Sequence, residues 1–429
     1  MMFNSYEEVE KYMKQRDVIG IKPGLERMNR LLTRVGNPEQ EITAIHVAGT
    51  NGKGSTIHYM SEAFRSHGYQ VGIFTSPSMY GLRGHILHNG LPISKKNILS
   101  IMNELYPYIQ QLDQEEMAPT PFEILTVIAF RYFAKYVDLS LIETGMGGRE
   151  DTTNCITPIL SIITSVAKDH QALLGNTIEQ IASHKAGIIK PMIPVILGEL
   201  EESAYQVILE EAKKKQAKVY RFGFDFTCDN KRQEGTRQHF QWKTKTIEMP
   251  ICLQMSGEHQ VKNASMALMA LFIFHQKYYP LNKKYIQNAL THTQIPGRFE
   301  KVSEQPHIII DGAHNQAGID AFIQTVNEQY KNKKKQLVFA GFKDKDLKEM
   351  LTKCIPFFES VYITTFEHPR AIGARQLQKE IGASNLFVEE DWQELLRGLI
   401  TSSSSKEESI FIVGSFHFIT IVRRYLLGE

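Results

Sequence analysis

The segment "HVAGTNGKGST" (His46–Thr56) constrains the fold most, because it packs three glycines, a lysine and several hydroxyls into one short stretch. The apolar, β-branched residues before it, Glu41–Val47, predict a strand, and Ser55–Gly68 after it has apolar residues at helical spacing. A strand, a glycine-rich turn and a helix form a phosphate-binding arrangement, because the backbone can wrap an anion at the helix N-terminus. We expect Lys53 to reach the β- and γ-phosphates of a nucleotide and Ser55 to lie near Mg²⁺.

This loop is a short variant of the usual GxxxxGK[ST] pattern, because Val47 stands in the place of the first glycine. The alternative interpretation is a glycine-rich turn with a solvated lysine. The strand and helix patterns on either side favour the phosphate loop.

Composition excludes several classes of protein. The chain has 429 residues, enough for two or three domains, and a net charge of +2, which favours neither nucleic acid nor a membrane surface as a partner. The four cysteines are scattered without a CxxC pair, which suits a reducing compartment and argues against a zinc site. The acidic N-terminal stretch does not resemble a signal peptide, so we expect a cytoplasmic protein. We also expect a monomer whose partners are small molecules.

Short apolar runs alternate with helical patterns, which predicts βαβ units and a mostly parallel sheet. In the first part of the chain the expected strands are 42–47, 71–75, 139–143, 159–165, 194–197 and 218–222. Expected helices there include 94–112 and 178–189, the second opened by a capping box of Thr177 and Gln180. A proline–glycine break near residues 291–302 precedes five more expected strands, at 307–310, 336–340, 361–365, 386–388 and 410–413. The fold class is therefore α/β, with a large N-terminal P-loop domain (1–294) and a smaller C-terminal Rossmann-like domain (295–429).

Polar residues follow several of these strands, at the edge where α/β sheets bind ligands. Glu143 ends one strand, and a carboxylate near a phosphate loop is typical of a site for nucleotide-bound Mg²⁺. Asp169 and His170 are expected at the end of the next, and Ser76 adds a hydroxyl after the second. A structural histidine and a plain Ser-Pro turn are the alternatives for His170 and Ser76.

Two further groups of residues are candidates. Glu123 lies in the first turn of an apolar helix, where it could bind substrate or only stabilise the helix dipole. In the second domain, "IIIDGAHNQAG" (Ile308–Gly318) ends a buried strand with Asp311 and His314. Both are expected at the ligand-binding edge of the sheet.

Over nearly its whole length the chain resembles the folylpolyglutamate synthase/dihydrofolate synthase family of Mur-type ligases. Ten motifs carry the resemblance in the family's order: "AGTNGKGST", "TSP", "TPFE", "ETGMGGREDTTN", "DHQALLGNT", "KAGIIKP", "SGEHQVKNA", "PGRFE", "DGAHN" and "GFKDKD". The resemblance implies an ATP-dependent ligase that adds L-glutamate to a folate or dihydropteroate carboxylate through an acyl phosphate.

The resemblance also implies the roles of individual residues. Catalysis would depend on Lys53, His170 and Lys185, the last of which matches a lysine that the family carries as a carbamate. Two Mg²⁺ ions would be held by Ser76, Glu143, His170 and the carbamate of Lys185. ATP would be bound by Gly49, Thr50, Asn51, Gly52, Lys53, Gly54, Ser55, Asn263, Arg298 and Asp311. The remaining substrate contacts would come from Ile21, Lys22, Glu123, Asp151, Thr152 and His314.

This sequence departs from the family pattern around the acceptor site. An aromatic or histidine residue and a Glu-Arg pair are replaced by Ser78, Gly84 and His85, while Lys168 and His184 replace other residues beside the expected metal site. We expect Gly84 to loosen its loop and to weaken or narrow activity on ordinary folates. Two alternatives remain open: a related ligase with a non-folate acceptor, and a nucleotide-binding paralogue without catalysis.

Overall fold

The computed structural model describes residues 2–331, 333–402 and 408–428, and the chain divides into two compact units. The first unit comprises Met1–Arg232, His239–Cys252 and Val261–Thr293, and the second comprises Gln233–Gln238, Leu253–Gln260 and Gln294–Glu429. Two short segments before the expected boundary therefore pack with the second unit.

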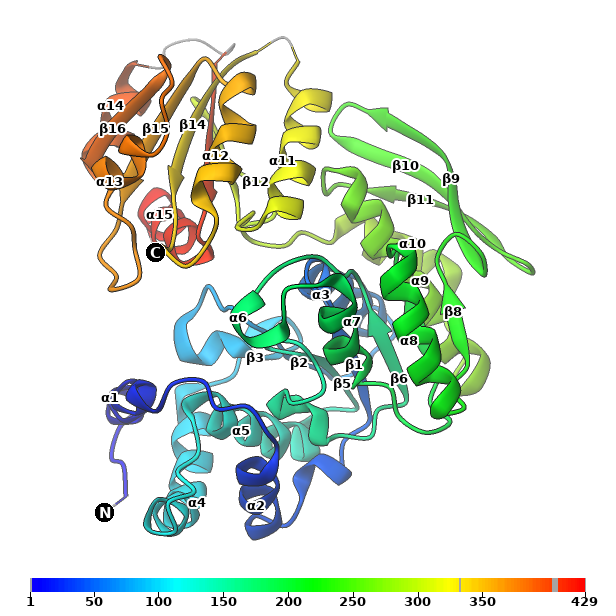
Figure 1. Cartoon of the computed structure of the whole chain (residues 1–429). Coiled ribbons are helices and arrows are strands. Elements are labelled where there is room, and N and C mark those ends of the chain that lie inside the picture. Colours follow the sequence, from blue (N-terminus) through cyan, green and yellow to red (C-terminus); the bar gives the residue numbers. More distant parts are fainter. Residues whose placement is uncertain (1, 332, 403–407, 429) are drawn as a thin grey trace. The chain divides into compact units, whose positions relative to one another are not determined.

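The first unit is built on a sheet that has eight strands among the described residues, in the order β4-β3-β2-β5-β1-β6-β7-β8 (Figure 1). These strands are β1 (Ala44–Ala48), β2 (Val71–Phe74), β3 (Ile86–His88), β4 (Leu91–Pro92), β5 (Leu139–Glu143), β6 (Leu160–Ile163), β7 (Val195–Leu197) and β8 (Val219–Arg221). In this order, the neighbouring strands β2, β5, β1, β6, β7 and β8 pair in parallel, and only the short strands β3 and β4 at one edge pair antiparallel. This confirms the expected mostly parallel sheet.

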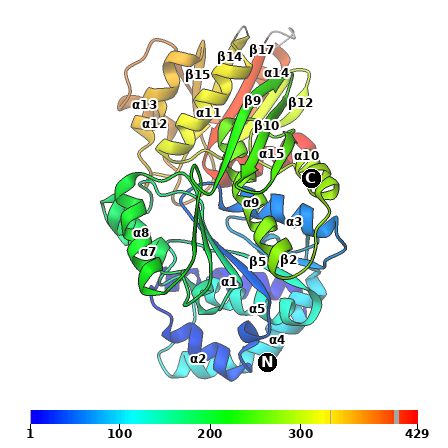
Figure 2. The ribbon, with the colours of Figure 1, turned by 90° about the vertical axis from the view of Figure 1, so that its right-hand side faces the viewer.

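Helices cover both faces of this sheet. They are α1 (Tyr6–Gln15), α2 (Glu26–Arg34), α3 (Lys53–Arg65), α4 (Lys95–Gln114), α5 (Pro121–Tyr136), α6 (Gln171–Leu174), α7 (Ile178–Ala186), α8 (Glu202–Lys214), α9 (Glu258–Lys277) and α10 (Lys283–His292). One core joins α1, α2, α4 and α5 to Ala44 of β1, and another joins α7 and α8 to Ala48 of the same strand. Because alternate residues of a strand share a face, His46 lies on this face too. Figure 2 shows α3 on the other side of the strands from α4 and α5.

The local sequence explains where these helices begin. The predicted capping box of Thr177 and Gln180 is present at the start of α7, and a second one, of Thr120 and Glu123, starts α5. In α4 the whole predicted apolar stripe is buried: Ile98, Ile101, Met102, Leu105, Ile109 and Leu112. The predicted end of α7 at Ile189 was too late, because the helix ends at Ala186 before Gly187.

A small sheet in the order β11-β10-β9 follows β8, and the sequence analysis did not predict it. Its strands are β9 (Phe226–Glu234), β10 (Arg237–Thr244) and β11 (Glu248–Leu253). The last six residues of β9 are all polar and exposed, so this strand lacks the apolar alternation by which a half-buried strand is recognised.

The second unit has its own sheet, in the order β12-β13-β17-β14-β15-β16. Its strands are β12 (Glu300–Glu304), β13 (His307–Asp311), β14 (Lys334–Ala340), β15 (Ser360–Thr365), β16 (Leu386–Asp391) and β17 (Glu408–Gly414). Only β12, which was not predicted, is antiparallel to its neighbour. The helices are α11 (Gln316–Gln329), α12 (Leu347–Cys354), α13 (Ala374–Lys379), α14 (Trp392–Ser402) and α15 (Phe416–Leu427). Across the described ranges of both units, no helix is long and apolar enough to cross a membrane.

Candidate active site

The expected strand, turn and helix of the phosphate loop are present. Strand β1 ends at Ala48, the loop turns at Gly52, and α3 begins at Lys53 with Ser55 buried in its first turn. Gly52 has a φ of 86°, and a Cβ on it would lie 2.3 Å from Oδ1 of Asn263. The turn therefore requires glycine for its conformation and for the close approach of α9.

The segment after β6 holds the phosphate loop in shape. The backbone N–H of Thr50 donates to the carbonyl of Ser165 at 3.0 Å, and that of Asn51 donates to Oγ of Ser165 at 2.9 Å. The hydroxyl of Thr164 donates to the Asn51 carbonyl at 2.6 Å, and that of Thr50 donates to the Ala167 carbonyl at 3.1 Å. This support was not predicted, because Thr164 and Ser165 were expected to be the last two residues of the strand 159–165, whereas they follow its observed end at Ile163.

Lys53 and Glu143 meet beneath this loop. Nζ of Lys53 donates to the carbonyls of Gly49 and Thr50, at 3.0 and 3.3 Å, and lies 3.7 Å from Oε1 of Glu143. The other carboxylate oxygen of Glu143 accepts a hydrogen bond from Thr75. Both side chains are largely buried, with exposed fractions of 14% for Lys53 and 5% for Glu143. The partner of Glu143 is thus Thr75, directly after β2, whereas the predicted Ser76 lies one residue further along, half-buried.

Lys185 is the most unusual lysine of the site. It lies near the end of α7, is 2% exposed, and its Nζ has no hydrogen bond or ion pair within the part of the chain that the structure describes. The pKa of Lys185 is lowered from 10.5 to about 7, mainly by burial and also by the charge of Lys53, while Asp169 and Asp151 oppose the shift. A large fraction of this amine is therefore neutral, and thus nucleophilic, near neutral pH.

Asp169 and His170 were expected at the end of a strand, but they do not directly follow one. Strand β6 ends at Ile163 rather than Ser165, and both residues lie at the end of the loop that follows it. His170 has a φ of 51°, precedes the short helix α6, and its side chain is 44% exposed. Its Nε2 lies 3.9 Å from Oδ2 of Asp169.

Asp151 lies in the turn after β5, in the first unit with Lys53 and Lys185. The carboxylate of Asp151 accepts hydrogen bonds from the backbone N–H of Met146 at 2.8 Å and from both the N–H and the hydroxyl of Thr153, at 3.1 and 2.6 Å. Burial raises the pKa of Asp151, and these donors together with Lys53 oppose that rise. Thr152, also predicted, shares a hydrogen bond of 2.8 Å with Thr126 on α5.

Glu123 has an ion-pair partner and hydrogen bonds within its own unit, although its Oε1 accepts no hydrogen bond among the described residues. It is 1% exposed, closes the capping box of α5, and pairs with Arg27 at 3.2 Å. Arg27 also donates to the carbonyl of Lys22 at 2.5 Å, so the predicted Ile21–Lys22 segment is tied to the start of α5. Ile21 itself is 69% exposed, so its apolar side chain is accessible to a ligand next to Lys22, whose carbonyl Arg27 holds.

Three predicted site residues belong to the second unit: Arg298, Asp311 and His314. The carboxylate of Asp311 accepts from the backbone N–H groups of Phe299 and Ala313, each at 2.8 Å. Burial raises the pKa of Asp311, and the charge of Arg298 opposes the rise. The His314 ring shares a hydrogen bond of 2.7 Å with the Gly312 carbonyl.

The loop that departs from the family pattern is packed, which corrects the expectation that Gly84 loosens it. Gly84 is buried in a 3₁₀ turn, and a Cβ on it would lie 2.1 Å from Oγ of Ser78 and 2.7 Å from Cβ of Tyr80. His85 is tied to the Thr75 carbonyl at 2.8 Å, and burial lowers its pKa. The glycine therefore permits a close approach rather than adding freedom.

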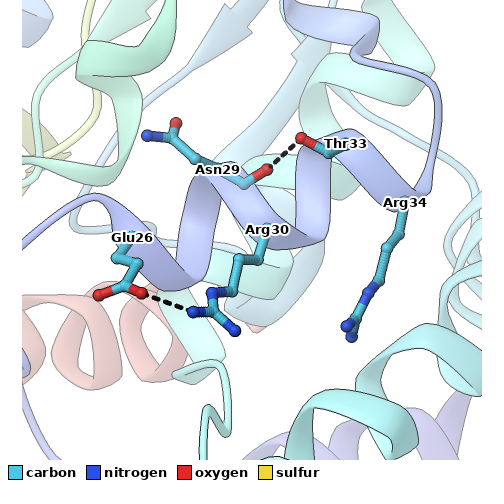
Figure 3. A pocket seen from close by; sticks show the side chains of 5 residues that line it. All are labelled: Glu26, Asn29, Arg30, Thr33 and Arg34. Carbon is cyan, nitrogen blue, oxygen red and sulfur yellow. Dashed lines mark hydrogen bonds and ion pairs between the residues drawn. The ribbon is translucent and has the colours of Figure 1, made fainter.

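A surface hollow of about 600 Å³ lies along α2, apart from the predicted site residues (Figure 3). Its lining residues are Glu26, Asn29, Arg30, Thr33 and Arg34. Arg30 pairs with Glu26 at 2.8 Å and Arg34 pairs with Glu115 at 2.7 Å, so both cations already have anionic partners. We assign no ligand to this hollow.

Metal binding has to be judged from single donors. In the part of the chain that the structure describes, no group of three or more His, Cys, Asp or Glu side chains could hold a metal ion. Mg²⁺ is commonly bound by one or two carboxylates together with substrate phosphates. The buried carboxylate of Glu143, beside the phosphate loop, fits that pattern, and a carbamate on Lys185 would add a second anionic oxygen donor.

Comparison with known proteins gives a consistent result across the chain. The family model of the Mur ligase middle domain matches residues 47–271, and that of the Mur ligase glutamate ligase domain matches residues 297–416. The dihydrofolate synthase/folylpolyglutamate synthase of Bacillus subtilis is 36% identical over 99% of this chain and 100% of its own length. The folylpolyglutamate synthase of Lacticaseibacillus casei is 33% identical over 94% of both chains.

Solved structures extend the likeness to the whole fold. The Mycobacterium tuberculosis folylpolyglutamate synthase complexed with ADP and AMPPCP superposes with a TM-score of 0.89 at 28% identity, covering 99% of this chain and 98% of that one. An FPGS–AMPPCP–folate complex superposes with a TM-score of 0.86 at 31% identity, covering 99% of this chain and 100% of that one. The chain therefore belongs to the folylpolyglutamate synthase/dihydrofolate synthase family of Mur-type ligases.

Proposed function

We propose that this protein is an ATP-dependent ligase that joins L-glutamate to the carboxylate of a folate or dihydropteroate through an acyl-phosphate intermediate. The Bacillus subtilis relative, which matches 99% of the chain, carries both activities in its name, the Lacticaseibacillus casei relative carries one, and similar structures hold an ATP analogue alone or together with folate. The acceptor and nucleotide are therefore proposed by similarity, and the chemistry is argued from this chain's residues.

The observation that carries the proposal is the grouping of Lys53, Glu143 and Lys185. The lysine proposed to bind phosphate lies 3.7 Å from a buried carboxylate, and a buried lysine without a partner among the described residues has a pKa of about 7. Binding a nucleotide would need the first lysine alone. The buried carboxylate and the neutral amine add features suited to transferring a phosphoryl group, which favours catalysis over binding alone.

In the first step an oxygen of the acceptor carboxylate attacks the γ-phosphorus of ATP, and ADP leaves. The phosphate loop, Gly49–Ser55, would bind the triphosphate through its backbone N–H groups and the N-terminus of α3. Lys53 would stabilise negative charge on the oxygens of the phosphoryl group while that group is transferred to the acceptor. In our proposal Asn263, Arg298 and Asp311 contact the rest of the nucleotide.

Mg²⁺, when bound, would neutralise phosphate charge and orient the triphosphate for in-line transfer. We propose Ser76 and Glu143 as ligands of one ion, and His170 with the Lys185 carbamate as ligands of another. The neutral amine of Lys185 can attack CO₂, which forms an N–C bond and releases a proton. The resulting carbamate is an anionic oxygen donor of the kind that hard cations prefer.

In the second step the amine of L-glutamate attacks the acyl carbon, and the C–O bond to phosphate breaks. Phosphate leaves with one oxygen that came from the acceptor carboxylate, and the amine loses a proton. We propose that Ile21, Lys22, Glu123, Asp151 and Thr152 line the acceptor side of the site and that His314 contacts substrate from the second unit. Excluding water here would protect the acyl phosphate from hydrolysis.

The test is ADP release measured over a panel of acceptors, with and without L-glutamate. Dihydropteroate, reduced folates and unrelated carboxylates, including amino-acid-linked ones, make up the panel. The proposal requires ADP release that depends on both a pteridine acceptor and glutamate. Release with only a non-folate acceptor would favour a related ligase, and nucleotide binding without any release would favour a paralogue without catalysis.

A further inference from the structure

A chain of hydrogen bonds runs from the sheet to Asp151. His46 lies in the middle of β1, is fully buried, and its Nε2 is 2.9 Å from Oγ1 of Thr153. The hydroxyl of Thr153 in turn is 2.6 Å from Oδ1 of Asp151. The family resemblance assigned no role to His46 or Thr153.

Counting donors and acceptors determines where the protons lie. The hydroxyl of Thr153 has one proton, and it donates this proton to the carboxylate of Asp151. Oγ1 of Thr153 must then accept from Nε2 of His46, so the imidazole carries its proton on Nε2. Nδ1 of His46 is buried and has no hydrogen-bond partner in the described chain, as expected for a nitrogen without a proton.

Burial supports the same arrangement. Together with the charge of Lys190 it lowers the pKa of His46 from 6.5 to about 3, so the ring is neutral throughout the physiological range. A neutral ring with a fixed tautomer can donate only one way along this chain. The carboxylate of Asp151 receives three donors in all, and each of them favours its ionised form and opposes the effect of burial on its pKa.

The turn that carries Asp151 is also held from its other end. The side-chain amide of Asn154 donates to the carbonyls of Arg149, at 3.0 Å, and Gly187, at 3.1 Å. Gly187 directly follows α7, the helix that carries Lys185. The turn is thus anchored to β1 through His46 and to the end of α7 through Asn154.

We infer that His46 and Thr153 are positioning residues that hold Asp151 as an oriented carboxylate for the acceptor substrate. This inference rests on the proposed function, in which Asp151 lies on the acceptor side of the site. His46 reaches the site only through Thr153, and its donated hydrogen bond sets which lone pairs of Asp151 remain free. The expected consequence is a selective effect on the acceptor, with little effect on ATP.

The test uses pairs of variants that remove or retain each donor. His46→Leu removes the hydrogen bond from His46 to Thr153, and Thr153→Val removes the hydroxyl that links His46 to Asp151. His46→Gln and Thr153→Ser can retain these bonds. Thr153→Val removes a hydrogen bond to a charged group and is expected to raise the KM for the acceptor about tenfold, whereas His46→Leu removes a bond between neutral groups and is expected to raise it about fivefold. Both variants are expected to leave the KM for ATP within about twofold. The retaining variants are expected to restore most of the acceptor KM.

A double-mutant cycle separates this role from a merely structural one. In an Asp151→Asn background, His46→Leu should have little further effect on the acceptor KM, because its effect acts through Asp151. Equal changes in the KM values of acceptor and ATP, or an undiminished effect in the Asp151→Asn background, would overturn the inference.

A measurement without substrate keeps the two proposals distinguishable. Nitrogen-15 NMR of histidine-labelled wild-type protein should show His46 as a neutral ring protonated on Nε2 from pH 8 to pH 5, and Thr153→Val should shift that signal. A His46 ring protonated on Nδ1 or on both nitrogens would overturn this hydrogen-bond chain even if the enzyme ligates glutamate. If His46 shows the predicted tautomer but the protein has no ligase activity, the hydrogen-bond chain is supported and the proposed function is refuted. The inferred role of His46 and Thr153 toward the acceptor would then be refuted as well.

Discussion

Nζ of Lys53 lies 3.7 Å from Oε1 of Glu143 and donates to the Gly49 and Thr50 carbonyls of the phosphate loop, while Thr75 donates to the other carboxylate oxygen. The lysine that would contact the transferring phosphoryl group is therefore held by the carboxylate proposed to bind Mg²⁺. Both groups are positioned by the protein alone, which is the kind of preorganisation that electrostatic catalysis requires.

Lys53→Ala should abolish most turnover while the protein stays folded. The lysine acts mainly on charge that develops during transfer, so kcat should fall at least ~10²-fold, the scale of one preorganised electrostatic contact. Steady-state kinetics and a thermal melt check this, with Lys213→Ala, an exposed lysine on α8, as the matched control. Near-normal turnover in folded Lys53→Ala would refute the phosphate-loop interpretation.

Thr75→Val should weaken the use of Mg²⁺, because it frees Glu143 to leave its position. Losing the partner that orients a metal ligand typically lowers metal affinity by about tenfold or more. The Mg²⁺ concentration for half-maximal activity measures this, and Ser76→Ala tests the predicted direct ligand in parallel. An unchanged Mg²⁺ requirement in Thr75→Val would show that the Thr75–Glu143 hydrogen bond does not position the carboxylate.

Lys185→Met should stabilise the protein and inactivate it. The pKa of Lys185 falls from 10.5 to about 7 on folding, so between these values the unfolded chain binds the extra proton. Wild-type stability should therefore rise with pH across this window, with the burial penalty complete below pH 7 and absent above pH 10.5. Without nucleotide, metal or added CO₂, the variant should gain at least about 1 kcal/mol at pH 7.

Chemical denaturation of wild type and Lys185→Met at several pH values measures this difference. Activity of Lys185→Met should be lost, and a small carboxylate such as formate or acetate could partly replace the carbamate oxygen. A variant that is both less stable at pH 7 and fully active would contradict a buried, functional amine at this position.

Gly84→Ala should destabilise the protein, because its Cβ would lie 2.7 Å from Cβ of Tyr80, which can move only together with its backbone, and 2.1 Å from Oγ of Ser78. Forcing an extra methyl group into such a contact typically lowers the free energy of unfolding by about 1–3 kcal/mol. Gly398→Ala is the control: this glycine lies within α14 with no atom within 4 Å of the added Cβ, so alanine should be neutral or stabilising. Equal stability of the two variants would restore the idea of a loose loop.

The βαβ framework was predictable from the sequence, because both sheets are mostly parallel and their strands read as buried apolar runs. The expected strand 139–143 coincides with β5, and the start and buried stripe of several helices followed from capping and periodicity. The polar strand β9 was not recognisable, since six of its residues face solvent and carry no apolar alternation.

The site was predictable as a set of residues but not as a set of contacts. Glu143 and Lys185 stood out by position or by resemblance, whereas the Thr75 partner of Glu143 and the His46–Thr153–Asp151 chain depend on distances between segments far apart in sequence. Gly84 shows the same limit in reverse. A glycine seen without its neighbours suggests freedom, and only the packed Ser78 and Tyr80 show that it permits contact.

The most direct test of the central claim follows one oxygen atom. Dihydropteroate labelled with oxygen-18 in its carboxylate is incubated with the wild-type protein, ATP, Mg²⁺ and L-glutamate, and the products are analysed by mass spectrometry. Our account predicts a product enlarged by one glutamyl residue and inorganic phosphate that carries one labelled oxygen. ADP release without a glutamylated product, or a glutamylated product with unlabelled phosphate, would contradict it.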